Sequence, residues 1–407
     1  MRVLVINSGS SSVKFRIVDV VGAPSGILHT SPPVLEGAVK GIGGAATVEA
    51  KGPDVPQVKS ALDVGNHTQA LRMLFDRFGG SFGRIDAVGH RVVHGGTEYM
   101  EPTVITDQVE AGIEALAELA PLHNPACLAG IRGAKGALGT SIPMVAVFDT
   151  AFHQTMPEVA RRYAIPMDMA ERHHIRRYGF HGIAHASLAD GYAVCARKPL
   201  QGTRLITLQL GNGCSIAAIV NGKSVETSMG FTPLEGLVMG TRSGDVDASI
   251  VGYLSEREKV EPAEVERWLN ERSGLLGVSG RSNDMKELLR AVERDHDKRA
   301  ELAVDLFCYR ARKYLGAYMA VLGGADGIVF GGGIGENAPE IRTRICREMH
   351  WCGIRLDADR NRAAVGLTPG SGVKISHEGA QPEVLVVAAD EETWIAKETA
   401  RCLGSNK

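Results

Sequence analysis

Charged side chains and histidines stand beside glycine or proline in several short stretches of the chain. The carboxylates Asp149 and Glu391 suit Mg²⁺, because that ion takes one or two carboxylates together with water and substrate phosphate. Each such group, taken alone, is more often structural than catalytic, but their shared position at strand ends and in glycine-rich loops indicates a functional site. The stretches are GHRVVHGG (89–96) with Arg91, APLHNP (120–125) with His123, VFDTAFHQTMP (147–157), YGFHGIAH (178–185) with His181, and MGTRSGDVD (239–247) with Arg242.

Two of these observations have alternative explanations. His181 and His185 have the i, i+4 spacing of a zinc pair, but no Glu follows His181 and no Cys pair supports it, so we do not predict zinc. Glu391 near the start of the last helix is also what the helix dipole favours, with Asp390 as the capping residue. The sequence alone leaves both interpretations of Glu391 open.

The stretch NSGSSSVK (7–14) separates two apolar runs, 3–6 and 13–18, that predict strands. Asn, Gly and Ser tolerate tight turns, so a hairpin is the simplest interpretation. The same turn leaves backbone N–H groups and hydroxyls uncovered, so it can also surround an anion, with Lys14 supplying positive charge. The Walker A spacing is absent, and a strand is expected to follow instead of a helix. If this loop binds phosphate, it does so as a hairpin.

Two later stretches also join an apolar strand to a turn of small residues. Strand 205–210 runs into GNG, and placing Gly9 on Gly211 gives an offset of 202 residues (211 − 9), which predicts an internal duplication. In GADGIVFGGGIGEN (324–337), a strand is expected to end in three glycines before a helix that begins near Ala338. The missing side chains there allow a base or ribose to approach the backbone, although backbone geometry alone also explains the glycines.

The pattern around these motifs predicts an α/β protein with a hairpin at its start. Strands and helices alternate through the first third, and a stretch rich in Gly and Pro, 22–56, is expected to form hairpins and loops. A segment rich in His, Arg and Tyr, 149–177, is the expected crossing between two domains that face one another. The other expected elements are strands at 85–88 and 144–148 and helices at 68–78 and 108–119.

Length and composition restrict the class of protein. A chain of 407 residues is long enough for two or three domains. With 45 basic and 47 acidic residues the net charge is −2, which argues against a nucleic-acid footprint or a membrane-surface patch and favours small partners. Seven cysteines form no C-x-x-C pair, and no apolar run is long enough for a signal peptide or a membrane span. We therefore expect a cytoplasmic protein with reduced thiols.

Taken together, the motifs resemble the acetate kinase family. The resemblance implies the duplicated ribonuclease H-like fold of the actin-like ATPases, with two domains and a nucleotide cleft between them. The first domain is expected at 1–149 plus 388–407, the second, which binds nucleotide, at 150–387, and two chains are expected to form a homodimer. The motifs are NSGSSSVKF, GHRVVHGG, APLHNP, VFDTAFHQTMP, YGFHGIAH, LGNGCS, ETSMGFTPLEGLVMGTRSGDVD, SGLLGVSG and GGGIGEN, in the family's order over nearly the whole chain.

The resemblance implies reversible transfer of the ATP γ-phosphate to acetate, giving acetyl phosphate and ADP by direct in-line attack. Mg²⁺, with Mn²⁺ as an alternative ion, is expected at Asn7 and Glu391. The catalytic residues are expected to be Arg91, His123, Asp149, His181 and Arg242, and the acetate site Arg91, Val93, Leu122, Phe180 and Pro233. The expected nucleotide-binding residues are Ser10, Ser12, Lys14, Gln209, Leu210, Gly211, Asn212, Gly213, Asp284, Met285, Lys286, Gly333, Ile334, Gly335, Glu336 and Asn337.

This chemistry fits the residue types. A carboxyl pKa is about 4, so acetate is already an anion at neutral pH and needs no general base. It does need relief from repulsion by the γ-phosphate. Two arginines, a histidine that donates a hydrogen bond and Mg²⁺ would provide it. Catalysis would then be mostly positioning and electrostatics.

Three positions depart from the usual family pattern, and two other functions stay open. The family usually has His at Gln209, Thr-Ser at Ile183-Ala184 and Thr-Asn at Ala389-Asp390. Gln still donates to a phosphate oxygen but is never charged, and Asp390 adds a negative charge beside the expected metal ligand. The first alternative is a propionate or butyrate kinase. The second is an actin- or Hsp70-like nucleotide switch, against which the arginines and histidines of the expected carboxylate pocket argue.

Overall fold

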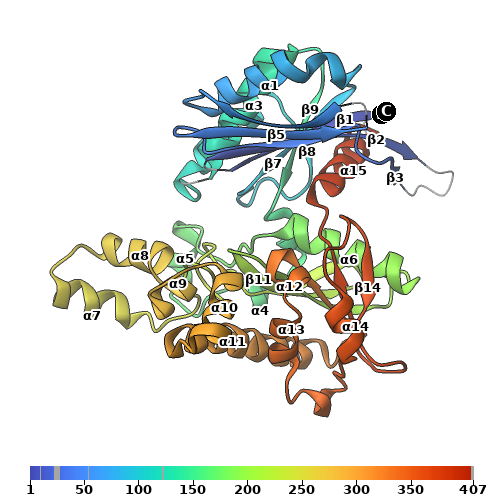
Figure 1. The fold of residues 1–407 in the computed structure, drawn as a ribbon. Coiled ribbons are helices and arrows are strands. Elements are labelled where there is room, and N and C mark those ends of the chain that lie inside the picture. The colour runs from blue at the N-terminus through green and yellow to red at the C-terminus, as the bar shows by residue number, and fades with distance from the viewer. Residues whose placement is uncertain (10, 23–27, 54, 122, 405–407) are drawn as a thin grey trace. The chain divides into compact units, whose positions relative to one another are not determined.

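The computed structural model describes residues 1–9, 11–22, 28–53, 55–121 and 123–404, and these residues form two compact units (Figure 1). Unit 1 comprises Met1–Phe152 and the C-terminal segment from Glu391, and unit 2 comprises His153–Asp390. The boundaries expected from the sequence lie slightly earlier, after residues 149 and 387. The α/β class expected from the sequence is confirmed.

Unit 1 is built on a sheet that has nine strands within the described residues. Its first strand, β1, is antiparallel to β2 in a hairpin that pairs Gly9 with Ser12. On its other side β1 is parallel to β7, which is in turn parallel to β9. The order is β6-β5-β4-β2-β1-β7-β9-β8, with β3 beside β2. The strands are β1 (Arg2–Gly9), β2 (Ser12–Gly22), β3 (Leu28–Thr30), β4 (Leu35–Lys40), β5 (Ala46–Gly52), β6 (Val55–Leu62), β7 (Ala87–Val92), β8 (Thr103–Val104) and β9 (Met144–Phe148).

Helices cover both faces of this sheet. Figure 1 shows α1 and α3 together on one face and α15 on the other. Gly130 of α3 lies against Ser8, and Gly89 of β7 lies against Ile395 and Thr399 of α15, so small residues allow both helices to approach closely. The helices are α1 (His67–Phe82), α2 (Asp107–Ala115), η1 (Leu116–Glu118), α3 (Asn124–Leu138) and α15 (Glu391–Gly404), and η2 (Ala151–Thr155) spans the boundary between the units.

Unit 2 has a sheet of six strands among its residues, in the order β12-β11-β10-β13-β15-β14. Helix α6 packs closely on β13 through Gly327 and Gly331, and α11 runs along the opposite side in Figure 1. The strands are β10 (Arg204–Leu210), β11 (Cys214–Val220), β12 (Lys223–Thr227), β13 (Gly327–Gly331), β14 (Gly372–Lys374) and β15 (Glu383–Val387).

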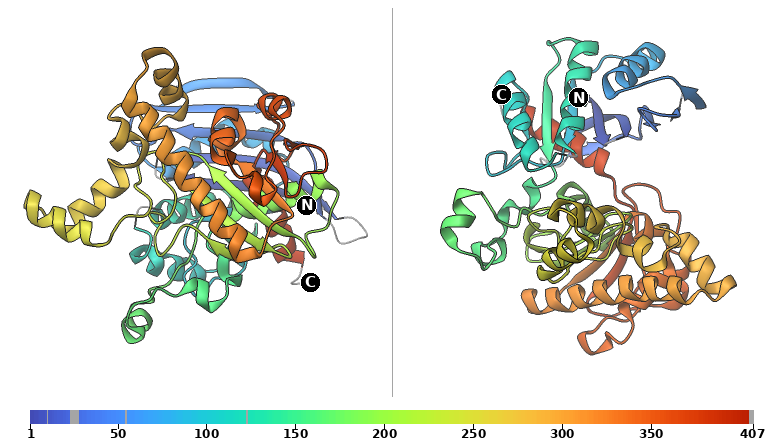
Figure 2. Two further views of the ribbon diagram at one scale, coloured as in Figure 1. Left: turned by 90° about the horizontal axis from the view of Figure 1, so that it is seen from below. Right: turned by 90° about the vertical axis from the view of Figure 1, so that its left-hand side faces the viewer.

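Helix α11 is the longest helix of unit 2, and the yellow helices α7 and α8 project together from the rest of the unit in the left view of Figure 2. The helices of this unit are α4 (Glu158–Arg161), α5 (Met167–Arg172), α6 (Gly182–Ala196), α7 (Ser249–Glu258), α8 (Pro262–Glu271), α9 (Gly274–Ser279), α10 (Met285–Asp295), α11 (Lys298–Leu322), α12 (Gly332–Asn337), α13 (Pro339–Cys346), η3 (His350–Cys352) and α14 (Ala358–Ala363). In the described part of the chain, no helix is long and apolar enough to cross a membrane.

The two units repeat one strand arrangement. In unit 2, β10 is antiparallel to β11 and parallel to β13, which is parallel to β15. The order β2-β1-β7-β9 therefore corresponds to β11-β10-β13-β15. Gly9 at the end of β1 corresponds to Gly211 just after β10, as the offset of the two hairpins predicted. The duplicated actin-like ATPase fold is confirmed.

The stretch 22–56 forms hairpins, as expected: β4 pairs antiparallel with β5, and Leu35, Val39 and Val48 enter the core despite the surrounding Gly and Pro. One local prediction needs correction. The strand predicted at 85–88 runs from Ala87–Val92, so Arg91 lies inside it.

The helix expected near Ala338 is confirmed as α13, which begins at Pro339. A short helix that the sequence did not indicate, α12, precedes it and begins at Gly332, whose φ of 74° turns the chain out of β13. The Glu336 carboxylate accepts the N–H of Gly332 at 3.0 Å and so satisfies a donor of the first turn.

Candidate functional site

In unit 1, three polar side chains meet at the carboxyl ends of parallel strands. Asn7 is near the end of β1, Arg91 is in β7, and Asp149 directly follows β9. The Arg91 guanidinium donates to Asp149 Oδ2 at 2.5 and 3.1 Å and to Asn7 Oδ1 at 3.3 Å. The carboxyl ends of parallel strands are where α/β sheets bind ligands. The arrangement fixes Arg91 by a two-nitrogen contact to a buried carboxylate.

Glu391, the first residue of α15, belongs to the same cluster. Burial raises the pKa of Glu391 to about 7, and Asp149 and Glu392 add to the increase while Arg91 and Lys14 oppose it. For Arg91, burial opposes the charge, but Asp149 and Glu391 outweigh it and raise its pKa. Glu391 and Asp149 both interact with the positive charge of Arg91, so a further cation here would stabilise the ionised form of Glu391.

The other site residues expected in unit 1 belong to β2 or lie next to the ends of β7 and α3. Ser12 and Lys14 belong to β2, Val93 is buried just beyond the end of β7, and His123 directly precedes α3. Two expected residues, Ser10 and Leu122, lie outside the described residues.

In unit 2, the second hairpin brings two further site candidates together. A Cβ placed on Gly213 would lie 3.4 Å from His181 Nε2 and 3.6 Å from Arg242 Nη1, so both side chains border the turn. Arg242 Nη1 donates to the carbonyl oxygen of Pro233 at 3.4 Å and contacts Met239 Sδ at 3.9 Å. Burial lowers the pKa of Arg242, and no carboxylate pairs with it among the described residues. This guanidinium is suited to an anion that comes from outside the chain.

A chain of hydrogen bonds orients the His181 ring. Ser215 Oγ lies 2.9 Å from His181 Nδ1 and 2.8 Å from His185 Nε2, and His185 Nδ1 lies 2.7 Å from Thr207 Oγ1. Burial, helped by the charges of His153 and His181, holds the pKa of His185 well below its usual value. Since the Ser215 hydroxyl has one hydrogen, it can donate to at most one of the two rings, so at least one ring nitrogen must carry a hydrogen and donate to it. The hydrogen positions of the two histidines are therefore coupled.

A pocket of about 1080 Å³ lies beside the second hairpin in unit 2. Its volume matches the upper range of small-molecule sites. Of the expected nucleotide-binding residues, it is lined by Gly211, Asn212, Asp284, Met285, Lys286, Gly333, Ile334 and Asn337. The lining residues that the sequence reasoning missed are Asn283, Leu289, Arg290, Val292, Glu293, Ala338, Pro339 and Glu340. Most of these lie on α10 or at the start of α13, and the helical spacing after Lys286 is the signal that could have found those on α10.

The remaining expected nucleotide residues of unit 2 lie near this pocket without lining it. Glu336 turns toward the backbone, where its carboxylate accepts the N–H groups of Gly332 and Ala389, and burial raises its pKa. The Gly335 carbonyl accepts from Arg342 at 2.8 Å. Gln209 and Leu210 end β10, and Gln209 Oε1 is buried without a hydrogen-bond partner. Phe180, which was expected at the acetate site, is buried and directly precedes His181 in the sequence.

Comparison with known proteins shows one consistent family. The model of the acetokinase family matches residues 2–397. The acetate kinase of Solibacter usitatus is 47% identical over 412 residues, which cover 99% of this chain and 98% of the relative. The crystal structure of Porphyromonas gingivalis acetate kinase has a TM-score of 0.89 at 40% identity, with 99% of each chain covered. A propionate kinase from Francisella tularensis has a TM-score of 0.88 at 38% identity, with 98% and 99% covered.

Replacing Glu391 with Gln tests the electrostatics of the first cluster. A carboxyl whose pKa is raised to about 7 in the folded state retains its proton while the unfolded chain loses it, so stability falls as pH rises toward 7. We expect the melting temperature of the wild type to fall relative to that of Glu391→Gln between pH 5 and pH 8 in metal-free buffer. Glu101→Gln, which changes an exposed carboxylate that has no part in the pKa shift of Glu391, is the control and should follow the wild type. Parallel curves for wild type and Glu391→Gln would contradict the assignment.

Proposed function

The chain belongs to the acetokinase family, and we propose that it catalyses the reversible transfer of the γ-phosphate of ATP to acetate, giving acetyl phosphate and ADP. The observation that carries this proposal is the meeting of His181 and Arg242 at Gly213, beside a pocket large enough for a nucleotide. A phosphate held by the turn would find a hydrogen-bond donor and an uncompensated positive charge at the same place.

The proposed reaction is a direct displacement. An acetate oxygen attacks the γ-phosphorus, and the bond from that phosphorus to the ADP oxygen breaks with its electron pair on ADP. Acetate needs no base at neutral pH, because a carboxyl pKa is about 4. Arg91 is proposed to hold the acetate carboxylate, Asp149 to position Arg91, and His181 and Arg242 to stabilise the phosphoryl oxygens.

Asn7 and Glu391 are the residues proposed to hold Mg²⁺, or Mn²⁺. The described residues contain no group of three or more His, Cys, Asp and Glu side chains that could hold a metal. That finding fits an ion that uses one or two protein oxygens and completes its shell with water and phosphate. The raised pKa of Glu391 also fits, because a buried carboxyl beside Asp149 gains from a cation. When bound, the ion would offset phosphate charge.

The direct test is a hydroxylamine trap for acyl phosphate, with ATP, Mg²⁺ and acetate, propionate or butyrate. We expect acetyl phosphate, with ADP formed in equal amount. ATP hydrolysis that is independent of any acid would instead support a nucleotide switch. Faster product formation from propionate than from acetate would support a propionate kinase, the candidate function that the likeness to a solved propionate kinase favours.

The compartment and the oligomeric state are part of the proposal. All seven cysteines are unpaired in the structure, which supports a reducing compartment such as the cytoplasm. For a homodimer, the candidate contact is an apolar row on α11, because Leu302, Leu306 and Tyr309 are exposed at i, i+4 and i+7 spacing.

The dimer prediction is tested at the centre of that row. Leu306→Lys should convert a dimer of two 43.4 kDa chains into monomers, because it places a charge in an apolar contact. Light scattering after size-exclusion chromatography measures the mass. Val194→Lys changes an exposed apolar residue on α6 and should leave the mass unchanged. A dimeric Leu306→Lys would exclude this surface.

The charge of Arg242 is expected to dominate turnover. Arg242→Ala removes an uncompensated cation from the turn, and we expect kcat to fall by about 10²-fold or more while the protein stays folded. Arg204→Ala is the control and should leave kcat near that of the wild type. Arg204 lies at the start of β10, away from the turn, and donates to the carbonyl oxygens of Leu322 and Gly323. Near-normal acyl phosphate formation by Arg242→Ala would remove Arg242 from the site.

Val93 is expected to limit the length of the acid. Val93 is buried two residues after Arg91, and a valine leaves space for one methyl group in the proposed pocket. Wild type should prefer acetate over propionate by about 10- to 200-fold in kcat/KM, and Val93→Ala should narrow that ratio by improving propionate. Val88→Ala changes a buried valine of β7, the strand that precedes Val93, and should leave the ratio unchanged. An unchanged ratio in Val93→Ala would show that this side chain does not face the acid.

A further inference from the structure

The loop from Met229 to Met239 has no helix or strand of its own, yet it carries Pro233 and leads to Arg242. It follows β12 and begins the motif MGFTPLEGL. The Pro233 carbonyl accepts from Arg242 Nη1 at 3.4 Å, so the path of the loop determines where both groups lie. The backbone of this loop makes a few hydrogen bonds outside any sheet, such as those from the N–H groups of Tyr178 and Gly179 to the Gly230 carbonyl oxygen, and side chains add to these.

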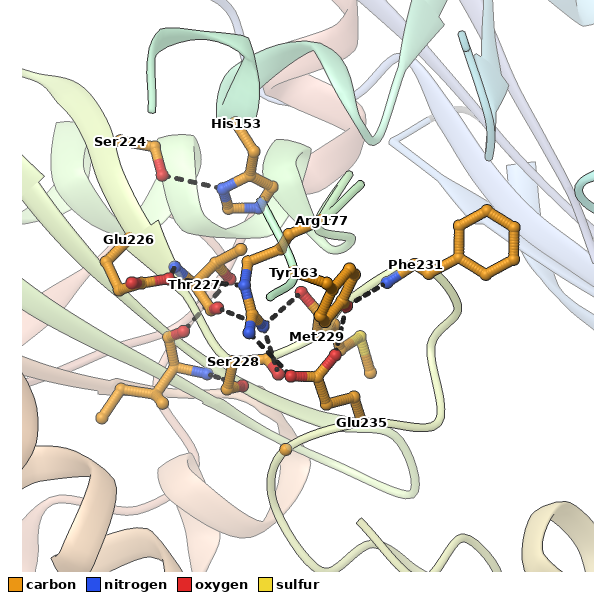
Figure 3. Close-up of polar contacts among 12 residues, drawn as sticks. His153, Tyr163, Arg177, Ser224, Glu226, Thr227, Ser228, Met229, Phe231 and Glu235 are labelled. Atoms are coloured by element: carbon orange, nitrogen blue, oxygen red, sulfur yellow. Dashed lines mark hydrogen bonds and ion pairs between the residues drawn. The ribbon is translucent and has the colours of Figure 1, made fainter. Parts of the chain in front are cut away.

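Arg177 makes the first set of these contacts (Figure 3). One terminal nitrogen of its guanidinium, Nη1, donates to the carbonyl oxygens of Thr227, Ser228 and Met229 at 3.1, 3.3 and 3.4 Å. The other, Nη2, donates to Glu235 Oε1 at 2.6 Å. Burial opposes the charge of Arg177, but Glu235 outweighs it and raises the pKa. One cation therefore binds the beginning of the loop and the residue two positions after Pro233.

Tyr163 makes the second set. Its hydroxyl donates to Glu235 Oε2 and accepts the backbone N–H of Phe231 at 2.8 Å, as Figure 3 shows. Phe231 and Glu235 flank Pro233 by two residues on each side, so the Tyr163 hydroxyl joins both arms of the loop.

Glycine at position 230 is what permits this arrangement. A Cβ there would overlap both Glu235 Oε2 and the Tyr163 hydroxyl, so a side chain would displace the carboxylate. Asp245 ties the far side of the loop, since its Oδ1 accepts the N–H of Gly236 at 2.8 Å. Polar contacts therefore hold the loop both before Pro233, at Phe231, and after it, at Glu235 and Gly236.

We propose that Tyr163 and Glu235, held by Arg177, are positioning residues that fix Pro233 and thereby set how long an acid the enzyme accepts. This inference rests on the proposed function. None of the three side chains needs to touch the substrate. Selectivity for one methylene is limited to about 10- to 200-fold, and a shift of about 1 Å in a pocket wall is comparable to the length added by that methylene. A loop that loses the contacts of the Tyr163 hydroxyl or the Glu235 carboxylate should therefore accept propionate better.

Tyr163→Phe tests this with the smallest change, the loss of one hydroxyl. We expect the acetate-to-propionate ratio of kcat/KM to fall by roughly 3- to 10-fold through better use of propionate, with KM for ATP within about twofold of wild type. Tyr192→Phe is the matched control. Tyr192 belongs to α6, and its hydroxyl also donates to a glutamate, Glu383, at 3.4 Å. Both variants should lose some thermal stability, but only Tyr163→Phe should change the ratio.

The outcomes separate this inference from the proposed function. If the wild type prefers acetate and Tyr163→Phe leaves the acetate-to-propionate ratio of kcat/KM unchanged, the inference is overturned but the proposed function stands. The same holds if Tyr192→Phe changes this ratio as much as Tyr163→Phe does. A wild type that forms no acyl phosphate overturns the proposed function and this inference with it. If Tyr163→Phe does not fold, Glu235→Gln takes its place, because it retains the shape and removes the charge that pairs with Arg177, and the same change of ratio is expected.

Discussion

Both units depend on one strand that is antiparallel to its successor and parallel to a later strand. In unit 1 this strand is β1, and in unit 2 it is β10. The constraint places the hairpin turn at the edge where the parallel strands have their carboxyl ends. Side chains that are far apart in the sequence, such as Asn7, Arg91 and Asp149, meet there because three parallel strands end together. The short turn needs small residues for its geometry, and those residues also leave its backbone open to an anion.

The candidate arginines, Arg91 in unit 1 and Arg242 in unit 2, have opposite surroundings. Arg91 is paired with the buried carboxylate of Asp149, which fixes its direction and reduces the charge that a substrate meets. Arg242 has only a carbonyl and a thioether as partners among the described residues, so its charge is fully available beside Gly213. A carboxylate that must approach phosphate needs both: an oriented contact to hold it, and an uncompensated cation where negative charge accumulates.

Much of this could be predicted from the sequence, for physical reasons that also explain the failures. Apolar alternation located β1, β2, β9 and β10, and the repeated turn of small residues correctly indicated the duplication. The Gly- and Pro-rich composition of 22–56 correctly indicated hairpins there, whereas the strand expected at 85–88 was placed too early, because Ile85 is apolar and buried but precedes β7. The contacts among Tyr163, Arg177 and Glu235 could not be predicted from the sequence, because these residues come from separate segments and meet only in the folded structure.

The backbone at His181 shows how the fold selects the atom that acts. His181 has a φ of 57°, a left-handed conformation that costs a residue other than glycine roughly 1–3 kcal/mol. Gly179, at 75°, must be glycine, because a Cβ there would lie 2.5 Å from Thr227 Cγ2. These two turns start α6 and aim the His181 ring at Gly213, and Ser215 occupies Nδ1. The Nε2 side of the ring then faces the hairpin turn, so the cost of the backbone conformation is offset by a ring that is held in one direction.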